Sequence, residues 1–376
     1  MLKFTQAPVK RSSSPSSISG VPFFPRLGVP LDKLAPQVTE PSRPSCSGVC
    51  EDDLRLSQKA KFSAKENFGK RARVKYLTEA MAVGLANVPG SNLTKSYWNT
   101  FYCSSVLQKQ GDKLTGKFCK NRWCLVCCRI RSAQLIKQFA PLLNSWSEKH
   151  LVTLTVPNCT AADLVTTLEK MTAAFDAIRR RFTMQHRRKQ RAAPLVALRK
   201  LECTHNPDRD DYHPHFHLVL PDFISAVELR EAWLLEYPGA KWKAQDVRPA
   251  NAGASHELFK YFTKLVTTQS KERFIRLGPL NTIFEAIAGR RTFQAFGVKA
   301  PKEVLTDDEA DAVADELGDI EALFEWSQAA TDWVDKASGE LLTNYVPSPQ
   351  FRKFVESKIV YNSPNKQFLP PEIMLN

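Results

Sequence analysis

The clearest hydrophobic pattern in the chain begins at His150. The run HLVTLTV is apolar and β-branched, which predicts a strand that Pro157 ends. Thr160 and Asp163 are residues that commonly begin a helix. Apolar residues then recur at alternating spacings of four and three, which predicts a helix with one core-facing stripe: Leu164, Leu168, Met171, Phe175, Ile178 and Phe182.

Two more strands are predicted at residues 194–204 and 213–220. The polar run NPDRDD between them predicts an antiparallel hairpin. Ser225 and Glu228 have the spacing of a capping box that opens a helix through Leu235. A short strand near residues 244–247 and a helix over 255–268 follow. The order β-α-β-β-α-β predicts an α+β fold, a ferredoxin-like (split βαβ) antiparallel sheet with helices on one face.

The segments outside this pattern differ in composition. Residues 1–60 are rich in Ser, Pro and Gly, which is typical of a disordered arm. Residues 61–145 begin with helical patterns and then carry most of the cysteines, and residues 146–300 contain the predicted sheet. Residues 301–376 form an acidic region of unknown role, with a helix predicted over 306–326 from the spacing of Val313, Leu317, Ile320, Leu323 and Phe324.

The charge of the chain indicates the class of partner that it binds. The 376 residues carry a formal net charge of +14, and nine Lys or Arg fall within residues 179–200. Such an excess favours a polyanionic partner, nucleic acid above all, over a merely solvated basic surface. No apolar run has the roughly 18–20 residues of a membrane span, and the N-terminus lacks the apolar part of a secretory signal. We therefore expect a cytoplasmic protein that does not enter membranes.

The histidines suggest a metal site. His215 and His217 flank Phe216 on a predicted strand, so they point to the same face, with Cα atoms roughly 7 Å apart. Their imidazoles can converge on one ion, while Phe216 points into the core. The alternative is a pair of exposed histidines without a metal.

A third ligand has three candidates. Glu202 on the neighbouring strand is the favoured one, because a carboxylate with two imidazoles suits Mn²⁺ or Mg²⁺. His205 is the second choice, although it falls on the opposite face of that strand from Glu202. His213 has the right parity, but Pro214 places it at the frayed start of its strand.

The predicted helix over residues 255–268 carries a candidate nucleophile. Glu257, Tyr261 and Lys264 share one face at i, i+4 and i+7, beside an apolar stripe of Leu258, Phe262 and Leu265. A tyrosine attacks only when its phenolate is favoured, which Lys264 and a metal-bound phosphate would do. Glu257 is placed to act as a base. The alternative is an ordinary amphipathic helix.

The cysteines are the sharpest isolated motif. Cys119, Cys124 and Cys127 follow the pattern C-x4-C-x2-C, and Cys103 lies upstream as a fourth ligand. Four thiolates at such spacing hold tetrahedral Zn²⁺ and stabilise a small subdomain. Cys128 is a competitor for Cys127. The alternative is a set of free, buried cysteines.

Taken in order, the segments FCKNRWCLVC, LVTLTVPN, LECTHN, YHPHFHLVL, ELFKYFTKL and GRRTFQAFGV resemble the replication initiators of rolling-circle plasmids. These are HUH (His-hydrophobe-His) endonucleases with a single catalytic tyrosine. The resemblance runs from about Cys103 to Gly297. This chain departs from the pattern at Leu125-Val126, where the family often has Pro, and at His205, where an aromatic residue is common. The second departure leaves the third metal ligand open.

The resemblance implies a metal-dependent single-strand DNA endonuclease and strand transferase. His215 and His217 would ligate the metal, Tyr261 would attack the DNA to form a 5′-phosphotyrosine and a free 3′-OH primer, and Glu257 would assist the later rejoining. The expected partners are origin DNA, single-stranded or in a hairpin at the nick, and a host polymerase and helicase, since no G-x4-G-K-[ST] motif is present. The acidic segment is expected to be a solvated helix that shields the basic surface; the alternative is a contact for the helicase or for a second protomer.

Two other functions fit parts of the pattern. An HUH transposase or relaxase would share the chemistry, but the cysteine cluster and the position of Tyr261 after the histidines favour an initiator. A zinc-ribbon DNA-binding protein without catalysis would explain the cysteines and the charge, and would leave the histidine strand and the tyrosine helix unexplained.

Overall fold

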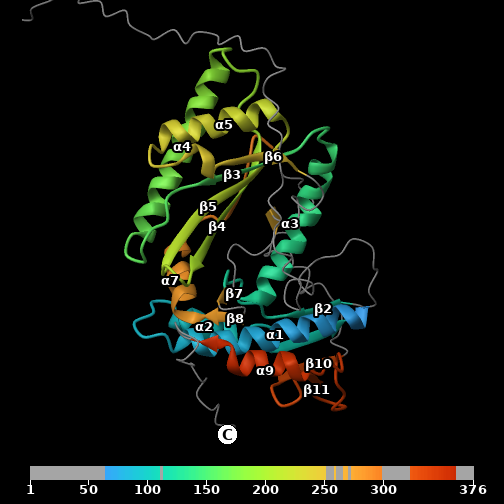
Figure 1. The fold of residues 1–376 in the computed structure, drawn as a ribbon. Coiled ribbons are helices and arrows are strands. Elements are labelled where there is room, and N and C mark those ends of the chain that lie inside the picture. The colour runs from blue at the N-terminus through green and yellow to red at the C-terminus, as the bar shows by residue number, and fades with distance from the viewer. Residues whose placement is uncertain are drawn as a thin grey trace, which may run out of the picture. The chain divides into compact units, whose positions relative to one another are not determined.

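The chain divides into two units, residues 1–60 and 61–376. The computed structural model describes residues 64–110, 113–250, 258–259, 266–269, 272–298 and 322–360, all in the second unit (Figure 1). The arm expected at residues 1–60 lies outside the described residues.

A five-stranded antiparallel sheet forms the centre of this unit, with strand order β6-β3-β5-β4-β9. Its first four strands follow the chain as β3-α4-β4-β5-α5-β6, which confirms the predicted split βαβ order, and β9 adds an edge strand beside β4. The bounds are β3 His150–Thr155, α4 Leu164–Arg187, β4 Ala197–Asn206, β5 Asp211–Leu220, α5 Phe223–Glu236, β6 Asp246–Pro249 and β9 Phe293–Phe296.

Helices α4 and α5 cover one face of this sheet (Figure 1). The predicted apolar stripe of α4 is buried at every position from Leu164 to Phe182. On β5, Phe216 points into the same core, with its ring 5.6 Å from that of Phe175 on α4 and 5.8 Å from that of Trp233 on α5. Alternation along β5 therefore turns His215 and His217 to the opposite face.

The start of α5 differs from the prediction. Asp222, not Ser225, is the N-cap, and its Oδ1 accepts a hydrogen bond from the Ser225 amide at 2.7 Å. Glu228 pairs with Arg191 instead of closing a capping box. The Asp222 carboxylate reaches the third amide of the helix and leaves Ser225 inside its first turn.

Helix α3, Leu125–Ser145, packs against the opposite face of the sheet. Phe139 and Leu143 of α3 pack in one apolar cluster with Leu151, Leu198 and Val219 of the sheet. Leu258 and Phe259, which are helical and buried, belong to the same cluster. The prediction of helices on one face thus holds for α4 and α5, and α3 is an addition on the other face.

A second sheet joins segments far apart in the chain, in the order β11-β10-β1-β2. Leu323 and Phe324 lie in β10, so the end of the helix predicted over 306–326 is wrong; residues 299–321 are outside the description. Phe324 packs with Trp333, and Trp326 donates from Nε1 to Glu79 of α1 at 2.7 Å. The bounds are α1 Ala64–Ala86, α2 Thr94–Phe101, β1 Val106–Gln110, β2 Lys113–Gly116, β10 Ala322–Ser327 and β11 Asp332–Asp335.

A third sheet has the order β12-β8-β7. Because Val266–Gln269 is strand β7, the helix predicted over 255–268 is wrong at its C-terminal end, where the β-branched residues pair with β8. No helix within the described segments is long and apolar enough to cross a membrane. The remaining elements are η2 Trp242–Ala244, β7 Val266–Gln269, β8 Glu272–Arg276, α7 Leu277–Ile287, α9 Pro349–Ser357 and β12 Ile359–Val360.

Candidate metal centres

Three potential ligands converge on the face of the sheet that lies opposite α4 and α5. His215 and His217 of β5 each place Nε2 3.4 Å from Oε2 of Glu202 on β4. The strand register explains this, because His215 lies directly opposite Glu202. Ligands about 2.1 Å from one ion are roughly 3.0–3.4 Å apart, so this set fits a divalent cation without rearrangement.

The other nitrogen of each imidazole is already held. His215 Nδ1 donates to the carbonyl of His213 at 3.1 Å, and His217 Nδ1 contacts Thr153 Oγ1 on β3 at 3.2 Å. A carbonyl accepts only, so neutral His215 keeps its proton on Nδ1 and leaves Nε2 free as a metal ligand. The arrangement is the one expected of metal-binding histidines with oriented rings.

Electrostatics keeps the carboxylate of this group ionised. Burial disfavours the charge of Glu202, but before an ion binds, imidazoles protonated at Nε2 donate hydrogen bonds to it, and these bonds, together with the positive charge of Lys200, hold the pKa of Glu202 well below its usual range. Lys200 reaches Glu202 Oε1 and is itself buried. The Oε2 atom remains turned toward the histidines.

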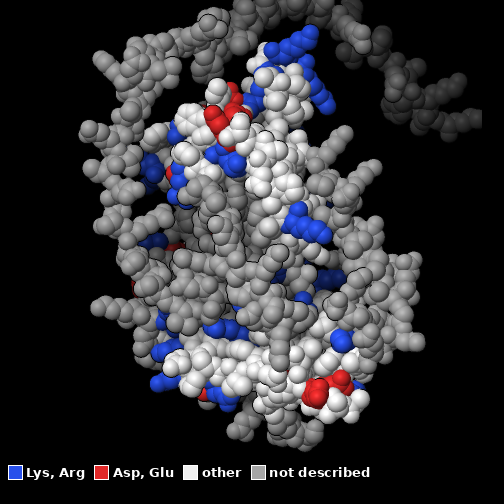
Figure 2. All heavy atoms as spheres, turned by 90° about the vertical axis from the view of Figure 1, so that its right-hand side faces the viewer, with Lys and Arg blue, Asp and Glu red and all other residues white. Residues whose placement is uncertain are grey.

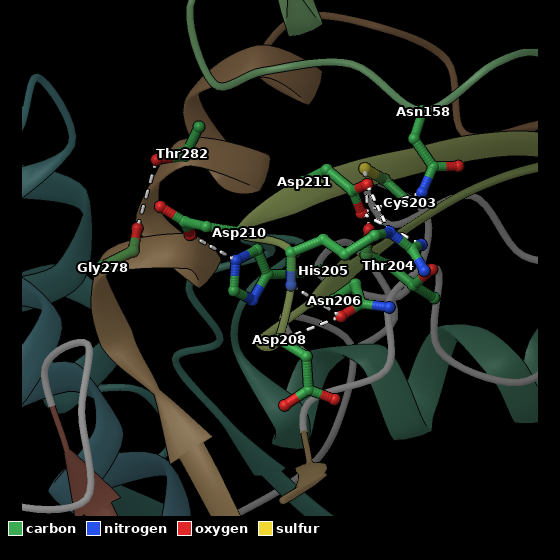
Figure 3. Close-up of polar contacts among 11 residues, drawn as sticks. Asn158, Cys203, Thr204, His205, Asn206, Asp208, Asp210, Asp211, Gly278 and Thr282 are labelled. Atoms are coloured by element: carbon green, nitrogen blue, oxygen red, sulfur yellow. Dashed lines mark hydrogen bonds and ion pairs between the residues drawn. The ribbon is translucent and has the colours of Figure 1, made fainter.

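The two other candidates for third ligand lie elsewhere. His205 faces the opposite side of β4, beside the β4–β5 turn, and donates from Nε2 to Asp210 at 2.8 Å (Figure 3). His213 shares a face with His215, but its Nδ1 donates to Asn158 Oδ1 at 2.8 Å. Neither belongs to the ligand group that the structure brings together, which consists of Glu202, His215 and His217.

The candidate nucleophile and its neighbours, Glu257, Tyr261 and Lys264, lie outside the described residues. Two residues of their segment are described, Leu258 and Phe259, and both are at most 5% exposed. They pack with Leu198 and Val219, which lie two residues along their strands from Lys200 and His217. Leu258 and Phe259 therefore pack on the same face of the sheet as the ligand group.

The second candidate metal centre consists of Cys103, Cys119, Cys124 and Cys127, whose sulfur atoms all lie within 4.8 Å of one another. The Sγ of Cys127 is 3.5 Å from that of Cys103 and 3.7 Å from that of Cys119. A tetrahedral zinc site with Zn–S bonds of about 2.3 Å has sulfur atoms roughly 3.8 Å apart. The donor set and its spacing therefore fit Zn²⁺.

Backbone amides support these sulfur atoms. The amide of Cys119 points at Cys103 Sγ, and the amide of Cys127 at Cys124 Sγ, where Cys124 is the N-cap of α3. Hydrogen bonds among the thiols lower the pKa of Cys119 and raise that of Cys124, because the four cannot all ionise together without a cation. Cys128 is not part of this group, since its Sγ donates to the Arg122 carbonyl at 2.7 Å.

Sequence reasoning missed two supporting residues of the first centre. The sequence predicts only a strand position for Thr153 and no role for Lys200. The sequence does contain a weak signal for both, because each is a polar residue on the same face of its strand as apolar core residues, Leu151 and Leu198 respectively. Their partners could be identified only from the register of β3 and β4 with β5.

Comparison with known proteins gives matches over the part of the chain that holds most of these residues. The family model described as "Replication protein" matches residues 112–225, which include three of the four cysteines and the complete Glu-His-His group. A protein named "Protein rep" from Staphylococcus aureus is 31% identical over 184 residues, covering 44% of this chain and 77% of that protein. The chain belongs to the Rep family of replication proteins.

Other Rep proteins match over shorter segments. The one from Streptococcus pneumoniae is 30% identical over 109 residues, 27% of this chain and 32% of that protein. A Rep protein from a Bacillus species is 30% identical over 151 residues, 35% of this chain and 47% of that protein. The chain thus spans less than half of these two relatives. No solved structure matches this Rep-family chain.

Proposed function

We propose that this protein is a rolling-circle replication initiator that nicks one DNA strand at its origin by tyrosine attack. The observation that carries the proposal is the convergence of His215 Nε2, His217 Nε2 and Glu202 Oε2 on one face of the sheet. The Rep family membership supports the biological role. In this proposal residues 146–300 are the nicking domain and residues 61–145 the zinc-binding region.

The first centre would hold a divalent ion, Mn²⁺ or Mg²⁺, through Glu202, His215 and His217. When bound, such an ion polarises the scissile phosphate and offsets its charge. The protein's own contribution is orientation: the His213 carbonyl and Thr153 fix the imidazole rings, and Lys200 holds the other carboxylate oxygen. The strands hold these side chains rigidly, which suits a site that must position a phosphate closely.

Tyr261 is the proposed nucleophile. It follows the buried Phe259 by two residues in the sequence. Its Oη would attack the phosphorus, the bond from phosphorus to the 3′ oxygen would break, and the leaving oxygen would take a proton to become a 3′-OH. The 5′ phosphate remains joined to Tyr261. Lys264 would favour the phenolate by its charge.

Glu257 is proposed to act in the closing step. After one round of synthesis it would take the proton from an attacking hydroxyl, which displaces Tyr261 from the 5′ phosphate and rejoins the strand. The substrate must be single-stranded or in a hairpin loop, because a phosphate in stacked duplex is out of reach. The 3′-OH would prime a host polymerase, with a host helicase opening the duplex.

The four cysteines would hold a structural Zn²⁺.

A pair of variants tests the metal-binding role. Wild-type protein, Glu202→Gln and His205→Gln are incubated with the single-stranded origin strand of its replicon, with Mn²⁺ or with EDTA. We expect nicking by the wild type and by His205→Gln only when Mn²⁺ is present, and a loss of at least about 100-fold for Glu202→Gln, since a charged ligand is removed. Equal activity of Glu202→Gln and wild type would contradict the proposal.

A further inference from the structure

A group of unpaired cations lies on α4, on the face turned away from the core. Arg180 and Arg187 of α4 are exposed, and so are the C-cap residue Arg188 and the next residue, Lys189. Within the described part of the chain, none of the four has an acidic partner. By contrast, Arg179 pairs with Asp176, Arg181 with Glu236 and Arg191 with Glu228.

The spacing of these cations is regular. Arg180, Met184 and Arg187 occur at i, i+4 and i+7, which is one face of a helix, and Arg180 and Arg187 are about 10.5 Å apart along its axis; Arg188 is the C-cap of α4. The ion pairs of Arg181 and Arg191 fasten this end of α4 to α5. Figure 2 shows Lys and Arg side chains gathered at this end of the molecule, at the top of the view.

Stabilisation of the helix C-terminus explains only part of this cluster. Cations in the last turn interact favourably with the helix dipole, which accounts for Arg187 and Arg188. Arg180 lies two turns before the end of α4, and Lys189 lies beyond it. Four exposed cations at one end of α4, none with an acidic partner among the described residues, therefore favour a polyanion as ligand.

We propose that this face, formed by Arg180, Arg187, Arg188 and Lys189, is a docking surface for the backbone of duplex DNA beside the nick, an inference that rests on the proposed function. A rigid array suits a duplex, which presents about six phosphate charges over 10.5 Å of its length. Between the cations the face carries Thr183 and Met184. Neither has a ring on which a base can stack, as surfaces for single strands usually do.

The surface is separate from the nicking site. Helix α4 packs against the Phe216 side of the sheet, whereas His215 and His217 point to the other side. One phosphate cannot contact both. Duplex bound at α4 would therefore be a flanking segment of the origin, and the single-stranded part would pass to the opposite face of the sheet.

The test compares two variants with the same loss of charge. Arg187→Gln/Arg188→Gln removes two cations of the surface, and Arg352→Gln/Lys353→Gln removes two exposed cations of α9. Binding to a 30-base-pair duplex of mixed sequence is measured from 50 to 300 mM salt. We expect the first variant to lower the slope of log K against log salt by about two, and to weaken binding roughly 30-fold at 0.15 M salt, with little change in the control.

Two further measurements separate this inference from the proposed function. Nicking of a short single-stranded origin oligonucleotide should be unchanged in the α4 variant. Lys189 lies outside the helix, at a left-handed position (φ 57°) that Asn tolerates well. The substitution Lys189→Asn should therefore lower the salt slope by about one without destabilising the fold. The inference fails if the salt slope of Arg187→Gln/Arg188→Gln stays at the wild-type value, or if the α9 control loses as much affinity for the duplex. It also fails if this variant loses as much affinity for a single strand as for the duplex.

Discussion

The central apolar residue of the His-Phe-His motif should determine stability rather than metal binding. Phe216 is 1% exposed, and its ring makes edge-to-face contacts with Phe175 and Trp233. The guanidinium of Arg199 lies 4.4 Å from the ring centroid. Substitution by leucine keeps most of the apolar burial and removes these ring contacts.

The expected cost follows from those contacts. Two aromatic pairs contribute about 0.5–1.5 kcal/mol each beyond their buried area, and part of a desolvated cation–π contact is lost as well. Arg199 keeps its contacts with the rings of Phe175 and Phe296, so only part of its cation–π stabilisation is lost. We therefore expect Phe216→Leu to lower the free energy of unfolding by about 2–3 kcal/mol, a shift of about 1 M in the urea midpoint with an unchanged slope.

The assay is urea unfolding followed by fluorescence, with Mn²⁺ affinity measured separately in buffer. Phe223→Leu is the control, since Phe223 is 54% exposed and should change stability by no more than about 0.5 kcal/mol. Mn²⁺ affinity should stay within about threefold, because the backbone register with β4, not Phe216, aligns the histidines with Glu202. A midpoint equal to that of the wild type, or an equal effect of the control, would refute this reasoning.

Three other predictions follow from the same contacts. Replacing Cys127 by serine should abolish the bound Zn²⁺ measured by elemental analysis, whereas Cys128→Ser should retain one equivalent, because Cys128 donates to a carbonyl instead. Burial raises the pKa of Tyr212 to about 12, so its neutral form stabilises the fold; that stability is full below pH 10 and declines between pH 10 and 12. Tyr212→Phe should therefore lose less stability than the wild type between pH 9.5 and 11 in urea titrations, and an identical decline would contradict this. Trp326→Phe removes the hydrogen bond to Glu79 and should cost about 1–2 kcal/mol, with faster amide exchange in residues 322–335 as the measured result.

The sequence predicted the central sheet well because its signals are local. The apolar run at β3 and the stripe of α4 each determine one element from adjacent residues, and the turn between β4 and β5 fixes their pairing. Once β4 and β5 pair, the parity of Glu202, His215 and His217 follows without further information. This is why the ligand group could be predicted while its exact contacts could not.

The remaining features depend on contacts between distant segments. Nothing near Phe324 indicates a strand, because its partner Leu107 lies more than 200 residues earlier in the chain. The alternative predicted there, an acidic helix, followed from local spacing alone. In the same way, whether Cys127 or Cys128 joins the four-cysteine group depends on which of their sulfur atoms points toward Cys103 at the start of α3. Two adjacent cysteines in a sequence do not reveal this orientation.

The most direct test of the account is to locate the covalent bond to DNA. Purified protein is incubated with Mn²⁺ and a single-stranded oligonucleotide that carries the origin of its replicon, then digested with nuclease and trypsin, and the peptides are analysed by mass spectrometry. The account predicts a nucleotide joined to the peptide that contains Tyr261, absent with EDTA and in Tyr261→Phe. Cleaved DNA without any adduct, or an adduct on another residue, would contradict it.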